Sequence, residues 1–500
     1  MKKTQAPTLA RIVQHRLSLS RRATRTTHLL VVLPAGEAWH DAPESDAART
    51  ALKRRGKAAP DLVKQALTVE LSGGCLSVWL RLDESRDAFE WHSRLRQALK
   101  PLLDEQPRGL DIAVYGPDGF RARAARAAAY VAWLNGTPLP VWKGGKPPVA
   151  LQRIELHGAP HQDLSRERAL AEGNLLCREL TLLPPNQLTP ASYRERVRVL
   201  AKELGWQIEE IDQRRLTRMK AGAFLAVARG SGHQDAAIVR LAYSGEAGGG
   251  RRKVGKTIAL VGKGICFDTG GHNLKPARHM FNMHDDMNGS AVVLGLMLAA
   301  TRLGLPMRLT GWLAIAQNHI SPQAYTQNEI VTALDGTHIE VVHTDAEGRM
   351  VLADTLSLAT REKPAAILDF ATLTGSMAVA LGERMSGVIS NRDVLAELAV
   401  LAGQNSGERV VAFPMPEDYD EALESQVADV KQCTLEGEAD HILAARFLSR
   451  FVKDTPWLHV DLSASRCKGG LGAVGTDLTG FGVGLGLEIL EKLGRGALST

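Results

Sequence analysis

The sequence is poor in cysteine and in aromatic residues, and it has no long apolar run. Aromatic residues make up 5% of the 500 residues, and the five cysteines contain no Cys-x-x-Cys pair. Scattered cysteines of this kind are typical of a reducing compartment, so we expect no disulfide framework and a cytoplasmic location. The apolar stretch at 291–300 is far shorter than the roughly 20 residues that cross a bilayer. The run at 29–33 is too short for a secretory signal, so no membrane association is expected.

Two common signatures of catalytic chemistry are also absent. No His-Glu-x-x-His helix is present, which excludes the most familiar zinc-peptidase pattern. The glycine-rich segment 261–276 is not followed by Gly-Lys-Ser or Gly-Lys-Thr, so it does not match a nucleotide-binding P-loop.

The overall composition is that of an ordinary globular protein, with 44% hydrophobic and 23% charged residues. The net charge of +6 is unevenly distributed, because residues 1–160 contain 25 Lys and Arg against 15 Asp and Glu. Such an excess can attract DNA or another polyanion, and an ordinary solvated basic surface is the alternative interpretation. The basic residues that precede the first acidic residue, Glu37, are Lys2, Lys3, Arg11, Arg16, Arg21, Arg22 and Arg25.

The pattern of apolar segments predicts an α/β fold of two domains. A small N-terminal α/β domain is expected over 1–160, and a larger catalytic domain over 161–500, with a connector helix at 162–181. The larger domain is expected to have a mostly parallel central sheet flanked by helices, because strands and helices alternate there. The predicted strands are 28–34, 65–82, 109–115, 257–262, 308–316, 338–342 and 365–370, and the predicted helices are 119–134, 187–204, 288–303 and 350–361.

The first of three polar clusters is VGKGICFDTGGHNLKP at 261–276. A buried strand is expected to run into a loop that carries Lys263, Asp268 and Lys275. Glycines at four positions of this segment permit tight backbone turns. An ordinary turn is the alternative interpretation when the segment is considered alone.

The other two clusters carry acidic residues. In MHDDMNGS, Asp286 lies just before an apolar helix; in HTDAEGR, Asp345 and Glu347 would share one side of an extended segment. Helix capping is the alternative for each acid, and it is the role expected of Asp285. Ligand sites in α/β sheets form beyond the carboxyl ends of strands, so the three clusters are expected to meet.

Together the clusters predict a site for divalent cations. Four acids and three basic residues at strand ends would be costly to bury unless they were paired or bound to metal. Carboxylate-rich sites suit divalent ions, and two ions can lower the pKa of a water between them toward 7. The nearby histidines are expected to serve mainly as hydrogen-bonding groups: His272, His279, His284, His319 and His343.

The segments VGKGICFDTGG, NLKP, DDMNGSA, HTDAEGRMVLADTL and DFATLTGS resemble the signature segments of the leucyl (cytosol) aminopeptidase family, in the same order and at similar spacing. The resemblance covers about 170–485 and is unclear over 1–160. It implies a dinuclear metallo-exopeptidase that hydrolyses the N-terminal peptide bond of peptides, through a hydroxide bridging the two metals, with a preference for apolar first residues such as leucine. A dinuclear phosphatase, the alternative hydrolase, is disfavoured by the spacing.

The resemblance also implies a role for each site residue. One metal would be held by Lys263, Asp268, Asp286 and Glu347, and the second by Asp268, Asp345 and Glu347. Lys275 would polarise the scissile carbonyl, and Arg349 would position a bicarbonate ion that acts as a base. Met283, Thr372 and Gly375 would line the pocket for the first side chain.

The family likeness further implies two divalent ions per subunit, zinc or manganese with magnesium or cobalt as alternatives, and a homohexamer. A DNA-binding role of the basic N-terminal domain is the alternative added function. The sequence departs from the family pattern at Cys266, His272, Gln317 and His343, none of which is a metal ligand in the family. These departures bear on substrate preference and metal choice rather than on the reaction class.

Overall fold

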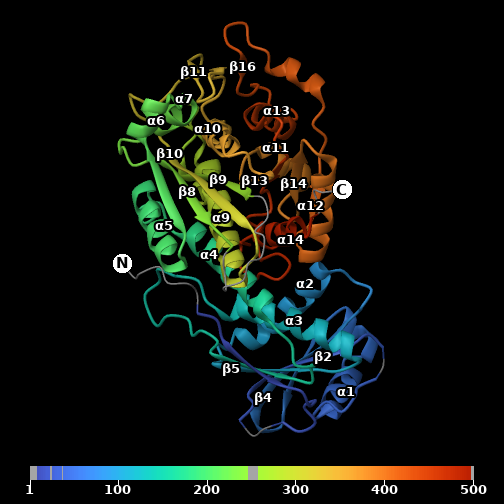
Figure 1. The fold of residues 1–500 in the computed structure, drawn as a ribbon. Coiled ribbons are helices and arrows are strands. Elements are labelled where there is room, and N and C mark those ends of the chain that lie inside the picture. Colours follow the sequence, from blue (N-terminus) through green and yellow to red (C-terminus); the bar gives the residue numbers. More distant parts are fainter. Residues whose placement is uncertain (1–7, 23–24, 37, 246–256, 497–500) are drawn as a thin grey trace.

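The computed structural model describes residues 8–22, 25–36, 38–245 and 257–496. The basic residues Lys2 and Lys3 lie outside the described residues. Two sheets, one above the other in Figure 1, organise the chain, and a short third sheet lies at the far end. Within the described ranges, no helix has both the length and the apolar character needed to cross a membrane.

The smaller sheet has the order β1-β6-β5-β2-β4-β3, with all neighbours parallel except β3 and β4. Helices α2 and α3 lie on the face toward the larger sheet, and α1 lies on the other (Figure 1). The strands are β1 Arg11–His15, β2 His28–Pro34, β3 Leu67–Leu71, β4 Cys75–Leu82, β5 Gly109–Val114 and β6 Arg153–His157. The helices are α1 Ser45–Arg54, α2 Ala88–Leu103 and α3 Asp118–Gly136, with 3-10 helices at Ala59–Val63 and Ser72–Gly74.

The larger sheet has the order β15-β14-β17-β13-β9-β10-β8-β7, in which the central strands β17, β13, β9 and β10 are parallel. The antiparallel neighbours lie toward its two sides. Its strands are β7 Gln207–Asp212, β8 Ala237–Tyr243, β9 Thr257–Asp268, β10 Arg308–Asn318, β13 Ala366–Ala371, β14 Ser386–Ser390, β15 Val410–Ala412 and β17 Trp457–Asp461. The third sheet contains β11 Ile330–Thr332, β12 His338–Glu340 and β16 Val430–Lys431.

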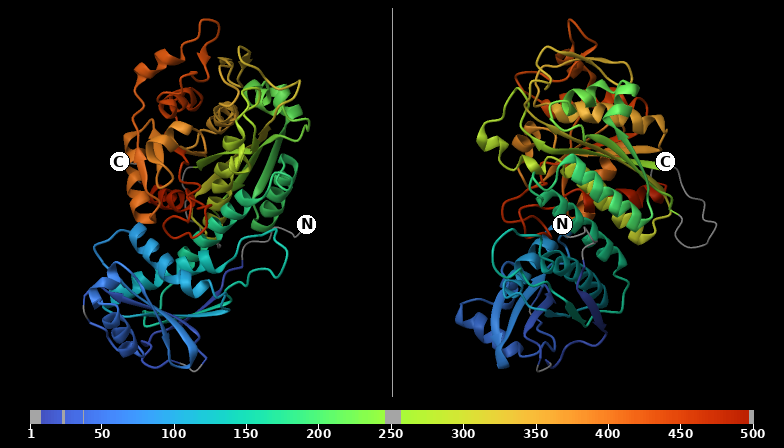
Figure 2. Two further views of the ribbon diagram at one scale, coloured as in Figure 1. Left: turned by 180° about the vertical axis from the view of Figure 1, so that it is seen from behind. Right: turned by 90° about the vertical axis from the view of Figure 1, so that its left-hand side faces the viewer.

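Helices cover both faces of the larger sheet, as Figure 2 shows from two further sides. One face carries α4 Ser165–Leu182, α5 Pro190–Leu204, α9 Asn288–Leu303, α12 Asp393–Ser406 and α14 Val483–Gly494. The other carries α7 Gly222–Ala228, α10 Glu347–Arg361 and α13 Asp440–Val452. Shorter helices are α6 Gln213–Met219, α8 Ala277–Met280 and α11 Gly375–Leu381, with 3-10 helices at Met283–Asp285 and Glu417–Leu423.

The two main units share a hydrophobic cluster. Buried residues of α2 and α3, such as Leu99 and Leu134, belong to the same cluster as Leu170 and Leu175 of α4. The small sheet ends with β6 and the larger unit begins with α4, but the apolar contact is continuous across them. The domain boundary near residue 160 therefore stays a prediction.

The mixed α/β class with its mostly parallel centre is confirmed, and the apolar runs at 28–34 and 288–303 form β2 and α9 with the predicted bounds. Three predictions were wrong in detail. The segment 65–82 forms two antiparallel strands, β3 and β4, because the chain turns at Gly73 and Gly74, which have positive φ. Strand β9 continues to Asp268 rather than ending at 262, because its second half stays paired with β10. The strand predicted at 338–342 is only three residues long, and it belongs to the third sheet instead of the central one.

Helix α9 lies unusually close to the sheet because glycines face each other at the contact. A Cβ on Gly289 would be 2.0 Å from the carbonyl oxygen of Phe370, and one on Gly262 would be 2.5 Å from Cα of Ser290. Neither glycine can therefore be replaced without moving the backbone of the helix or the strand. This close approach brings the start of α9 to the ends of the central strands.

We expect Gly289→Ala to destabilise the protein by about 3 kcal/mol, because the added methyl group would meet a backbone carbonyl that cannot rotate away. Gly119→Ala is the matched control, since Gly119 is also helical and nothing lies within 4 Å of its added Cβ. That change should be neutral or stabilising by up to ~1 kcal/mol. Urea denaturation of both variants measures the difference, and equal stabilities would contradict the close-packing argument.

Candidate functional site

Polar side chains gather at the carboxyl ends of the central strands. Asp268, Asn318 and Asp461 are the last residues of β9, β10 and β17, and Thr372 directly follows β13. This is the edge at which parallel α/β sheets commonly bind ligands. The loops that follow these strands form one side of a large cleft.

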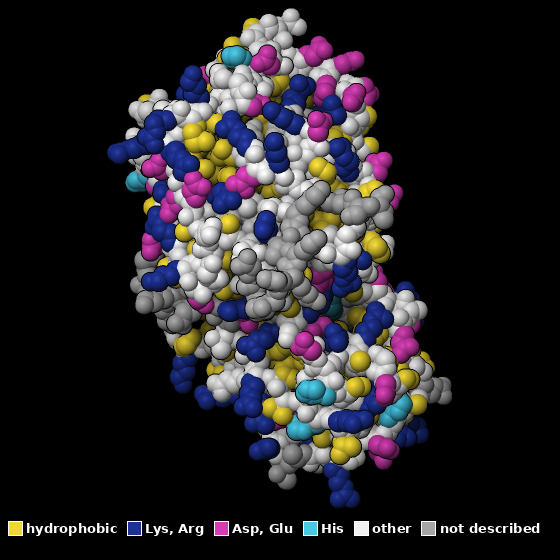
Figure 3. All heavy atoms as spheres, viewed as in Figure 1, with side chains coloured by type: hydrophobic (Ala, Val, Ile, Leu, Met, Phe, Trp, Pro, Cys, Tyr) yellow, Lys and Arg dark blue, Asp and Glu magenta, His cyan; other side chains and the backbone are white. Residues whose placement is uncertain are grey.

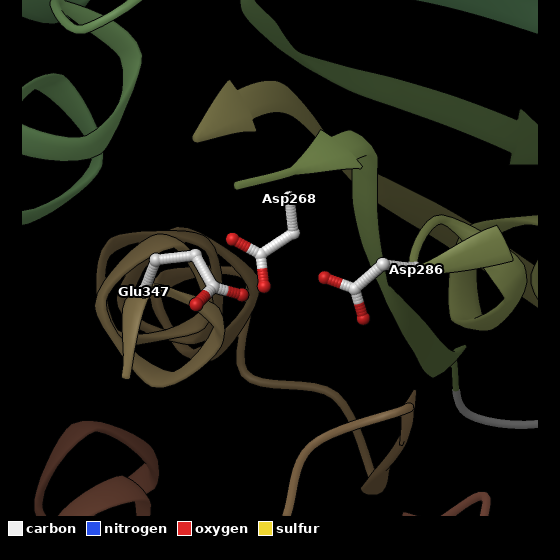
Figure 4. Close-up of side chains that lie close together, drawn as sticks. All are labelled: Asp268, Asp286 and Glu347. Carbon is white, nitrogen blue, oxygen red and sulfur yellow. The ribbon is translucent and has the colours of Figure 1, made fainter. Parts of the chain in front are cut away.

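Three buried carboxylates converge at this edge. Asp268 comes from β9, Asp286 from the turn before α9, and Glu347 from the first position of α10, and Figure 4 shows their carboxylates pointing toward one another. Their exposed fractions are 2%, 5% and 1%, and one oxygen of each lies within 4.8 Å of the others. So many acidic oxygens at such short distances require a compensating positive charge.

Two lysines supply positive charge to this cluster. Nζ of Lys263 lies 2.9 Å from Oδ2 of Asp286 and 2.8 Å from Oε1 of Glu347, and it donates a hydrogen bond to the carbonyl of Thr372. Nζ of Lys275 lies 2.8 Å from Oδ2 of Asp268 and also forms an ion pair with Asp345. Each lysine thus bridges two of the acids that the sequence placed in the site.

Burial and the neighbouring charges shift the pKa values of both lysines and of Asp345. Burial lowers the pKa of Lys263, but the surrounding carboxylates, Asp286 first, outweigh that effect and hold the pKa above its ordinary value. Lys275 shows the same balance, with Asp268 as the largest favourable charge raising its pKa. Burial raises the pKa of Asp345 to about 7, and the negative charges of Asp268 and Glu347 add to the effect.

Hydrogen bonds hold the acids in place. Oδ1 of Asp268 accepts hydrogen bonds from the backbone N–H of Gly270 and from Nδ2 of Asn318, at 2.8 and 2.9 Å. The hydroxyl of Thr372 donates to Oδ1 of Asp286 at 2.7 Å. The orientation of both carboxylates is therefore fixed by neighbouring strands.

Asn318 and Tyr325 were not predicted as site residues. Both donate hydrogen bonds to the carbonyl of Thr344, next to Asp345, and Asn318 also contacts Asp268. Asn318 ends an apolar strand, so its position at a strand end could have identified it. Tyr325 lies in a loop without a comparable signal.

Arg349 is almost completely buried on α10 and is held by two groups that the sequence did not indicate. Its Nη2 donates to both carboxylate oxygens of Asp440, at 2.8 and 2.7 Å, and its Nη1 donates to the carbonyl of Gln432 at 3.0 Å. Burial lowers the pKa of Arg349, and the charge of Asp440 more than offsets this. The guanidinium group is thus a fixed positive charge in the cleft wall.

All ten predicted site residues line a single cleft of about 1040 Å³. Met283, Thr372 and Gly375 lie in its wall beside the carboxylate cluster. The exposed apolar side chains Leu274, Phe281 and Leu435 also line it. The cleft therefore combines a charged floor with apolar walls, which suits a ligand that has both a polar and an apolar part.

Three local predictions for the site were wrong, although the residues do come together. Lys263 lies inside β9 instead of in a loop after it. Asp345 lies in a turn and Glu347 begins α10, so their segment is not extended. Asp285 does not cap α9; its carboxylate pairs with Arg466 at 2.9 Å.

The donor set fits divalent cations. The three converging carboxylates are hard oxygen ligands, and the partner that the structure gives to Oδ2 of Asp286 and to Oε1 of Glu347 is the ammonium group of Lys263. Oδ1 of Asp345 likewise faces the ammonium group of Lys275. A cation bound there would also repel the proton from Lys263, opposing the effect of the carboxylates on its pKa.

The part of the chain that carries this site is similar to known proteins. Residues 175–486 match the model of the cytosol aminopeptidase family, catalytic domain. A probable cytosol aminopeptidase of Stutzerimonas stutzeri is 36% identical over 472 residues, which are 89% of this chain and 93% of that protein. One of Syntrophotalea carbinolica is 42% identical over 334 residues, 66% of this chain. The aligned part spans 65% of that relative, less than two thirds of its length.

Solved structures with the same fold cover nearly the whole chain. A tomato leucine aminopeptidase mutant aligns with a TM-score of 0.83 at 25% identity, over 98% of this chain and 97% of the other. The bottromycin maturation enzyme BotP in complex with Mn aligns with a TM-score of 0.81 at 29% identity, over 93% and 99%.

Proposed function

Because the chain belongs to the cytosol aminopeptidase family, we propose that it is a metal-dependent aminopeptidase that removes the first residue of peptides. The observation that carries this proposal is the convergence of Asp268, Asp286 and Glu347, all buried, beside the two lysines. A carboxylate cluster at the bottom of a wide cleft suits metal-assisted hydrolysis.

Two divalent ions, zinc or manganese, would supply a water of lowered pKa and polarise the substrate carbonyl when bound. Lys263, Asp268, Asp286 and Glu347 would hold one ion, and Asp268, Asp345 and Glu347 the other. The Mn-bound BotP structure supports metal binding in this fold. The fixed orientation of Asp268 and Asp286 would limit the rearrangement that binding requires.

Lys275 and Arg349 would act on the reacting groups directly. Lys275 is 14% exposed and faces the cleft, so its ammonium group can stabilise negative charge that develops on the scissile carbonyl oxygen. Arg349, held by Asp440 and Gln432, would orient a bicarbonate ion that takes up a proton. Both charges are positioned before the substrate arrives, which avoids reorganisation during the reaction.

The walls of the cleft support a preference for apolar first residues such as leucine. Met283 contributes an apolar side chain, and Gly375 leaves space beside Thr372. We also propose a homohexamer and a cytoplasmic location, for which the support is the family membership.

We expect release of leucine from leucine p-nitroanilide, with loss of activity after chelation and recovery when Mn²⁺ or Zn²⁺ is returned. N-acetyl-leucine p-nitroanilide is the matched control. It should not react, because an aminopeptidase acts on a first residue whose amino group is free. Failure of the metal-loaded protein to release the first residue from any of a panel of aminoacyl amides would contradict the proposal.

DNA binding by the basic N-terminal unit remains the alternative added function. Its support is net charge alone, and on the face shown in Figure 3 basic and acidic side chains are interspersed over both units. DNA retention that weakens with salt and disappears on removal of residues 1–26 would favour this function.

A further inference from the structure

A second cleft, of about 370 Å³, lies between α2 of the small unit and the turn at 470–472 of the large one. It shares no lining residue with the carboxylate cleft. Six basic side chains line it against two acidic ones, Asp83 and Glu90. The basic residues are Lys64, Arg81, Arg86, Arg94, Arg96 and Arg384.

The lining has more basic than acidic side chains, so the cleft carries a net positive charge. Asp83 and Glu90 both face Arg86, at 3.5 and 3.4 Å. Arg96 donates instead to the backbone carbonyls of Gly472 and Gly469, at 3.0 and 2.8 Å. These neutral acceptors hold the guanidinium group but leave its charge in place.

Arg94 and Arg384 add to this excess. Arg94 donates to the carbonyl of Val63 and to Gln97, neither of which is charged. Arg384 forms no hydrogen bond or ion pair with any residue that the structure describes, and it faces the like charge of Arg96. Burial lowers the pKa of Arg94 and of Arg96, and for Arg94 this effect outweighs the opposing charge of Glu90.

The remaining side chains of the lining are mostly apolar. Leu82, Phe89, Trp91 and Leu471 line the same cleft, and Ser93 and Gln97 provide neutral polar groups. A volume of about 370 Å³ matches a small organic molecule, whereas a nucleic-acid duplex needs an open surface of roughly 1,000 Å² or more. Guanidinium groups match the oxygen geometry of phosphate particularly well.

We propose that this cleft between the two units binds a small phosphate ester, with its phosphate held by Arg94, Arg96 and Arg384 and its organic part against Phe89. The site is separate from the peptidase centre, and its existence does not depend on the activity proposed for that centre.

Calorimetric titration of the full-length protein with phenyl phosphate, at constant chloride concentration, tests the proposal. Arg384→Gln should weaken binding roughly tenfold or more, the effect of losing one charge-assisted hydrogen bond. Because Arg384 is exposed and bonds to no described residue, this variant should fold normally. Arg94→Gln should weaken binding in the same direction.

Arg392→Gln is the matched control. Arg392 follows β14 where Arg384 precedes it, is also exposed, and does not line the cleft. Binding should be unchanged in this variant and in Lys275→Gln, which alters the peptidase centre. The proposal is overturned if phenyl phosphate does not bind at millimolar concentration, if Arg384→Gln binds as tightly as the unmodified protein, or if only Lys275→Gln loses binding. Binding of a DNA duplex that depends on Arg384, without binding of phenyl phosphate, would overturn it as well.

Discussion

Replacing Asp268 with asparagine is expected to lower the metal content and to reduce aminopeptidase turnover on the order of a thousandfold, equivalent to about 4 kcal/mol of transition-state stabilisation. The proposed role of Asp268 is to contact both ions, so the loss of its negative charge affects both. The asparagine oxygen can still accept the hydrogen bond from the N–H of Gly270, so the loop should keep its conformation. Metal analysis of the purified variant and its turnover of leucine p-nitroanilide provide the two measurements.

Asp285→Asn is the control for this experiment. Asp285 precedes a proposed ligand and lines the same cleft, but its carboxylate faces Arg466. We expect this variant to keep its metal. An Asp268→Asn protein with a full complement of metal, or an Asp285→Asn protein without it, would show that the ligand assignment is wrong.

Replacing Lys275 with methionine is expected to reduce turnover roughly 100- to 1,000-fold while leaving the metal content close to normal. Methionine has a similar length but carries no charge, so it cannot stabilise a developing negative charge on the substrate. Because the proposed effect is confined to the transition state, the KM for leucine p-nitroanilide should change much less than kcat.

Lys275→Arg separates the charge of this side chain from its shape. It keeps the ion pairs with Asp268 and Asp345 available, so part of the lost turnover should return. Loss of bound metal in Lys275→Met would point to a structural role instead, and unchanged turnover in that variant would exclude the proposed role of Lys275 altogether.

Much of the central architecture could be predicted from local patterns. The apolar runs at 28–34 and 288–303 predict the bounds of β2 and α9, because most residues of both elements are buried. The three polar clusters could also be predicted to meet, since parallel strands end at one edge. The residues in those clusters do line one cleft.

Other features depend on partners distant in the sequence. Asp440 meets Arg349 across 91 residues, and no periodicity in either segment indicates the pairing. Likewise, the second half of β9 contains lysine, glycine and aspartate, which resemble a loop until the pairing of Lys263, Gly264 and Asp268 with β10 is known. Short strands such as β12 carry too few residues for their sheet to be inferred from sequence.

The segment 463–472 forms part of the wall of both clefts. Ser463, Ser465 and Arg466 border the peptidase centre. Arg96 of the small unit donates hydrogen bonds to the carbonyls of Gly469 and Gly472 in the same segment. Removal of the residues before α4 would remove both of these hydrogen bonds from a segment that borders the cleft. The small unit therefore helps to hold a segment that borders the catalytic cleft, and we expect the two parts to be most stable when they are expressed as one chain.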